Sequence, residues 1–152
     1  MTGSGSLISN DDLEFVKQKI NAVADDPSFS YFVKNMKIMS YITWLLEKVG
    51  SKPVIVGGHA VEIYTMGSYT TVDVDMILSN RAAAHEVLVS LGFTKQRGVR
   101  HWYSEELALP IEIPDDTLAG SYDKILEVVI DEGFVVYVIG IEPAWKLYKY
   151  RT

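Results

Sequence analysis

The sequence predicts a mixed α/β domain of the α+β kind, in which helices pack on a mixed β-sheet and two helices precede that sheet. Three observations predict this fold. Apolar residues recur every three or four positions in the first 50 residues, which is typical of amphipathic helices. A strand, a helix and a second strand are expected between positions 53 and 78. Short apolar runs then alternate with turn residues up to position 139, which is typical of further strands.

The composition fits one globular domain. The 152 residues are 48% hydrophobic and 22% charged, which suffices for a proper core. The net charge of −6 argues against general nucleic-acid binding, because that affinity comes mainly from neutralising phosphates. The absence of cysteine excludes disulfides and zinc–thiolate sites and favours a cytoplasmic location. No apolar run approaches the roughly 20 residues that span a bilayer, so we expect no membrane partner.

Two helices are expected in the first 50 residues. Ser9 or Asn10 can cap the first helix, and Pro27 stops it. Its apolar face consists of Leu13, Val16, Ile20 and Val23. Ser28 or Ser30 starts the second helix. Its broader apolar stripe consists of Phe32, Met36, Met39, Tyr41, Ile42, Leu45, Leu46 and Val49. These faces either pack on the sheet or form a homodimer interface, and the helical spacing favours core packing over a ligand groove.

The domain boundaries and later elements follow from similar signals. We expect a disordered tail over residues 1–8, which lacks the apolar core of a signal peptide, and a single domain over 9–152. Asn80 can cap a helix that Gly92 ends. Short apolar runs predict strands over 93–97, 100–104, 107–113, 125–130 and 134–139, and a helix starts in 143–152. Asp131-Glu132-Gly133 is a hairpin signal, although 125–130 is also compatible with a short helix.

The central segment combines a glycine pair with two acidic residues. A buried strand, Val54–Val56, breaks at Gly57-Gly58, and a helix is expected from His59 to about position 66. Glycines between a strand and a helix let a ligand approach the backbone amides, and the N–H groups at a helix start attract phosphate. The alternative is a tight turn without a ligand. A second strand is expected over 71–78.

That second strand carries Asp73 and Asp75, which point to one face because a strand has a period of two. Their oxygen ligands suit Mg²⁺ or Mn²⁺ better than zinc. Aspartate is a poor strand former, which favours a metal site over a solvated surface. Glu112 is the candidate third ligand, because it stands between two isoleucines and a neighbouring strand can present it to the same face. Asp115 and Asp116 are alternatives in a turn.

The run Gly57-Gly58-His59-Ala60, followed after a helix by Thr71-Val72-Asp73-Val74-Asp75, resembles the nucleotidyltransferase superfamily related to DNA polymerase β. It is most similar to the minimal nucleotidyltransferases of prokaryotes. The match covers residues 53–113 well and 133–142 loosely. The resemblance implies transfer of a nucleotide, with AMP as one candidate, from a nucleoside triphosphate to a hydroxyl of an unknown small molecule or protein. Some such enzymes are the antitoxin half of a toxin–antitoxin pair.

The resemblance also implies roles for single residues. Asp73 and Asp75 would bind two Mg²⁺ ions, one on the β- and γ-phosphates and one shared with Glu112 that activates the acceptor hydroxyl. The glycine pair would cradle the triphosphate, with His59 at phosphate or simply capping the helix. Thr71 would donate a hydroxyl within the site.

Two features depart from that pattern. Tyr69 stands where many relatives carry an arginine, and the chain ends at Thr152, where relatives continue into a helical segment. The alternative function is therefore a catalytically inactive relative that binds a nucleotide or a protein. A dinucleotide-binding domain is disfavoured, because the required Gly-x-Gly-x-x-Gly is absent.

Overall fold

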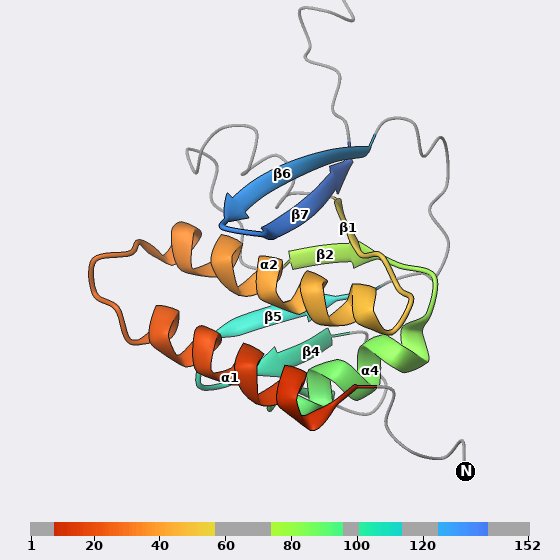
Figure 1. Cartoon of the computed structure of the whole chain (residues 1–152), viewed down its shortest axis with the longest axis horizontal. Coiled ribbons are helices and arrows are strands. Elements are labelled where there is room, and N and C mark those ends of the chain that lie inside the picture. The colour runs from red at the N-terminus through yellow and green to blue at the C-terminus, as the bar shows by residue number, and fades with distance from the viewer. Residues whose placement is uncertain (1–7, 57–73, 96–100, 114–124, 140–152) are drawn as a thin grey trace, which may run out of the picture.

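The computed structural model describes residues 8–56, 74–95, 101–113 and 125–139, which form an α+β domain (Figure 1). Within these residues, three helices pack on a seven-stranded mixed sheet. The helices are α1 (Asn10–Ala24), α2 (Tyr31–Lys48) and α4 (Arg81–Ser90). The strands are β1 (Val54–Val56), β2 (Val74–Ile77), β3 (Thr94–Lys95), β4 (His101–Ser104), β5 (Leu109–Glu112), β6 (Ile125–Asp131) and β7 (Phe134–Ile139). None of the described helices has the length and apolar character needed to cross a membrane.

Each helix begins at a side chain that satisfies an unpaired backbone N–H group. The side chains of Ser9, Ser30 and Asn80 each accept a hydrogen bond from the backbone three residues further on. The sequence offered two candidates for each of the first two caps, and the structure selects Ser9 and Ser30. Asn80 caps α4 as expected. These starting points follow from local chemistry, because the cap and the N–H group it satisfies lie within one helical turn.

The sheet joins segments that are far apart in the sequence. Its strand order is β3-β4-β5-β2-β1-β7-β6. The β2–β5 and β1–β7 pairs are parallel, and the other neighbours are antiparallel. The sequential strands β1 and β2 are antiparallel neighbours, which a dinucleotide-binding fold with its parallel sheet does not have. The structure therefore also argues against that reading.

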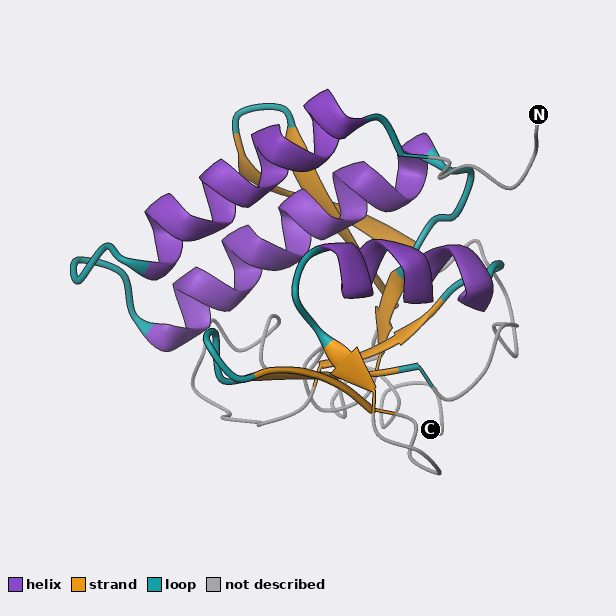
Figure 2. Ribbon diagram, turned by 90° about the horizontal axis from the view of Figure 1, so that it is seen from below, coloured by secondary structure: helices purple, strands orange, loops and turns teal. Residues whose placement is uncertain are grey.

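The three described helices lie on one side of the sheet (Figure 2). The side chains that the strands send toward them are buried, as the alternating burial along β2, β5 and β7 shows. Val74 and Met76 are 1% and 0% exposed, which agrees with a strand whose alternate side chains point to opposite faces. The apolar stripe of α2 contacts this face, so it packs on the sheet of its own chain. Asp75 and Glu112 belong to the other face, which the described helices do not cover.

The structure corrects the start of one expected strand and decides between strand and helix for another segment. The strand expected over 107–113 begins only at Leu109, because residues 105–108 form a turn in which Ala108 has a positive φ of 50°. Residues 125–130 form part of β6, so the helical alternative is wrong, because β7 pairs with them in an antiparallel hairpin. The elements expected over 57–73 and 143–152 lie outside the described residues, as does the tail over 1–7. The tail was expected over 1–8, and its last residue is a correction: Ile8 is 7% exposed and belongs to the core, because its apolar side chain is buried there.

Candidate functional site

Asp75 and Glu112 occupy directly paired positions on two neighbouring strands. The parallel strands β2 and β5 bring Val74 beside Ile111 and Asp75 beside Glu112. Both carboxylate residues are half-buried, whereas Val74 and Ile111 are buried on the opposite face. The sequence predicted that a neighbouring strand would present Glu112 to the face that carries Asp75, and the described strands have this geometry. The role of either residue as a metal ligand stays a prediction.

The buried residues on either side fix the direction of these two carboxylates. Asp75 lies between Val74 and Met76, and Glu112 lies between Ile111 and Ile113, all of which are at most 1% exposed. Because side chains alternate along a strand, the two carboxylates must leave by the face away from the helices. Turning either strand over would expose two apolar side chains and bury a carboxylate, which costs several kcal/mol (roughly 2 for each buried aliphatic side chain).

The two carboxylates belong to a row that crosses four strands. Val56 on β1 pairs with Asp75, and His101 on β4 pairs with Glu112. The row therefore reads Val56, Asp75, Glu112, His101. Nε2 of His101 lies 3.0 Å from Oε1 of Glu112, with side-chain exposures of 42% and 28%. The sequence alone does not point to His101, because nothing local shows which strand will lie beside residues 100–104.

The chemistry of the row suits a hard divalent cation. Like charges on directly paired strand positions repel one another. A cation shared between Asp75 and Glu112 would relieve that repulsion, and oxygen ligands are those that Mg²⁺ and Mn²⁺ prefer. The two carboxylates that the structure pairs are of the ligand type that the sequence implied for Mg²⁺ or Mn²⁺, and the metal itself stays a prediction. Within the described ranges, no group of three or more acidic, histidine or cysteine residues is arranged to hold a metal ion.

The other predicted site residues lie outside the described residues. These are Gly57, Gly58, His59, Thr71 and Asp73, together with Tyr69 and the alternatives Asp115 and Asp116. In the sequence, Gly57 directly follows Val56, and Asp73 directly precedes Val74. Gly57 is therefore adjacent in sequence to a member of the row, and Asp73 is two residues before Asp75, another member.

A recess of about 510 Å³ lies elsewhere, between α1, the end of α4 and the turn after β4. Glu105, Glu106 and Ser104 contribute to its polar lining, with Ile20 and Leu107 among its apolar residues. It contains no member of the row, and its carboxylates belong to a turn with exposed side chains. We therefore base the functional argument on the row.

Comparisons of the chain with protein-family models, with curated proteins and with solved structures gave no match.

Proposed function

We propose that the protein is a divalent-metal-dependent nucleotidyltransferase, which transfers a nucleotide from a nucleoside triphosphate to a hydroxyl of a small-molecule or protein acceptor. The observation that carries the proposal is the pairing of Asp75 with Glu112 on parallel neighbouring strands. It joins the acidic strand of the sequence motif to the third acidic residue, although the two are distant in the chain. Both carboxylates lie on the strand face opposite to the buried Val74 and Ile111.

In this proposal, Asp75 and Glu112 hold Mg²⁺ or Mn²⁺, and Asp73 supplies a further carboxylate. When bound, the metal neutralises phosphate charge and makes the acceptor hydroxyl easier to deprotonate. The buried residues beneath the two carboxylates keep them in register, which limits the rearrangement that binding requires. Backbone amides at Gly57 and Gly58 would bind phosphate oxygens, and Thr71 and His59 would contribute polar groups, as the sequence motif implies.

A second candidate is a binding protein with the same fold and no turnover. The observation that favours it is Tyr69, which replaces an arginine that would steady the phosphates in related enzymes. Both candidates predict metal-dependent binding of a nucleotide, and only the first predicts release of pyrophosphate. Whether the protein belongs to a toxin–antitoxin pair is a further proposal that depends on finding its acceptor.

The test is isothermal titration with Mg²⁺ and a panel of nucleoside triphosphates, followed by an assay of pyrophosphate release. Asp75→Asn and Glu112→Gln should abolish metal-dependent binding or turnover. The fold should stay intact, because neither side chain packs in the core. Glu105→Gln is the matched control, since this exposed glutamate lies in the turn after β4.

The outcomes separate the candidates. Binding with pyrophosphate release that disappears in both variants supports the transferase. Metal-dependent binding without release, under every acceptor condition tried, supports the binding protein. A folded Glu112→Gln variant that binds and turns over like the wild type would show that Glu112 is no part of the site.

A further inference from the structure

We propose that His101 is a positioning residue that holds the Glu112 carboxylate ready for the divalent cation, an inference that rests on the proposed function. His101 is absent from the sequence motif and enters only through the pairing of β4 with β5. It lies on the far side of Glu112 from Asp75, so Glu112 stands between a histidine and a second carboxylate.

The two side chains are in close polar contact, with Nε2 of His101 3.0 Å from Oε1 of Glu112. Because a carboxylate only accepts, the imidazole is the side that can supply a proton to this contact. The contact occupies one oxygen of the carboxylate and leaves the other as a ligand for a cation. The imidazole ring is attached through only two rotatable bonds to a residue paired within the sheet, which makes it a stiff support.

Glu112 has more need of such a support than Asp75. A glutamate has three rotatable side-chain bonds, so the register of β5 fixes where its side chain starts and leaves several rotamers open for the carboxylate. The contact with His101 selects among them before the metal binds. Carboxylates that bind metals are commonly held by polar contacts with outer side chains, and losing such a partner typically weakens metal affinity by about 10–100-fold.

A purely structural role makes a different prediction. The His101 and Glu112 side chains are 42% and 28% exposed, and a partly exposed pair of this kind contributes little to stability. If the pair merely stabilised the sheet edge, its loss would lower the melting temperature slightly and leave metal affinity unchanged. If His101 positions Glu112, metal affinity falls while the melting temperature stays close to that of the wild type.

The test titrates the full chain with Mn²⁺ alone and follows free Mn²⁺ by electron paramagnetic resonance. We expect His101→Ala to raise the Kd for Mn²⁺ by about 10–100-fold. His101→Gln should recover most of the affinity, because its amide N–H can donate to the same oxygen. Tyr103→Ala is the matched control: Tyr103 lies two residues further along β4, is 43% exposed and pairs with Pro110 rather than with Glu112.

Two results would overturn the positioning role: a folded His101→Ala variant with the Mn²⁺ affinity of the wild type, or a His101→Gln variant as weak as His101→Ala. Asp75→Asn and Glu112→Gln, measured in the same way, separate this failure from that of the proposed function. If both lower Mn²⁺ affinity and His101→Ala does not, only the positioning role falls. If neither lowers it, the metal site and the positioning role fall together.

Discussion

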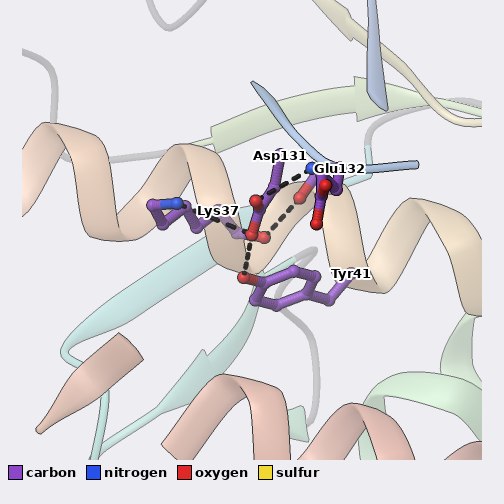
Figure 3. A network of polar contacts seen from close by, with 5 residues as sticks. Lys37, Tyr41, Asp131 and Glu132 are labelled. Carbon is purple, nitrogen blue, oxygen red and sulfur yellow. Dashed lines mark hydrogen bonds and ion pairs between the residues drawn. The ribbon is translucent and has the colours of Figure 1, made fainter. Parts of the chain in front are cut away.

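Replacing Asp131 by asparagine should loosen the β6–β7 hairpin from α2. Asp131 ends β6 and receives three contacts (Figure 3). Its Oδ1 accepts a 2.8 Å hydrogen bond from the backbone N–H of Glu132, and its Oδ2 accepts one of 3.0 Å from the hydroxyl of Tyr41. Nζ of Lys37 lies 3.6 Å from the same Oδ2. Two of these partners belong to α2, so one carboxylate ties the hairpin turn to the helix that covers the sheet.

The expected loss follows from the change in hydrogen bonding. Asparagine keeps one oxygen for the Glu132 N–H, but without charge, and puts an NH₂ group where Tyr41 and Lys37 need an acceptor. Hydrogen bonds to a charged group contribute about 1.5–3 kcal/mol and neutral ones about 0.5–1.5 kcal/mol, so the two bonds together lose about 2 kcal/mol. The partly exposed Lys37 pair adds less than about 1 kcal/mol. For a chain of this length, 2 kcal/mol corresponds to about 4–8 °C in Tm.

The same contacts predict a pH dependence. The Glu132 N–H first, and the Tyr41 hydroxyl second, hold the pKa of Asp131 below its ordinary value of 3.8. A lowered pKa in the folded state gives stability that is present above the unfolded pKa and is lost as the pH falls through the folded pKa. The difference in stability between wild type and Asp131→Asn should therefore be full at pH 7 and shrink below about pH 4.

Thermal and urea unfolding of both proteins at pH 7 and pH 3 measures this prediction. Glu132→Gln is the matched control, because it removes a neighbouring exposed charge and leaves the backbone N–H that Asp131 uses. Mn²⁺ affinity should be unchanged in both variants, since neither residue belongs to the row of the candidate site. The reasoning is refuted if Asp131→Asn matches the wild type within about 0.5 kcal/mol at pH 7, a change typical of substitutions without a structural role.

Three further predictions concern a turn glycine, a helix cap and a pair of tyrosines. Gly133 has a φ of 72°, so Gly133→Ala should cost about 1–2 kcal/mol in urea unfolding, and Gly133→Asn should cost less. Ser30→Ala removes the 3.2 Å cap on the N–H of Val33 and should cost about 1 kcal/mol, whereas Ser30→Asp should not. Burial first, and a carboxylate partner second, raises the pKa of Tyr41 and of Tyr137 to about 12. The unfolded chain therefore releases these protons first, near pH 10, so stability should fall between about pH 10 and 12; absorbance at about 295 nm that shows every tyrosine ionising near pH 10 would contradict this.

Much of the fold could be predicted because its signals are local. The caps Ser30 and Asn80 lie within one turn of the N–H groups they satisfy. The hairpin at Asp131-Glu132-Gly133 joins strands that are adjacent in sequence, and alternation along residues 74–77 identifies the buried face. The misplaced start of β5 is of a different kind: nothing in the local pattern shows that residues 105–108 turn back before the strand begins.

The sequence by itself places Asp75 and Glu112 each between apolar residues, and the strand period of two predicts that both face away from the core if those neighbours are buried. It did not determine that they meet. Only the tertiary structure decided that β5 lies beside β2 and in which register, since strand pairing depends on contacts between distant segments of the chain. The pairing of β4 with β5 likewise brought His101 beside Glu112. Strand alternation therefore sets the direction of each side chain in the row, and the order and register of the strands decide which side chains become neighbours.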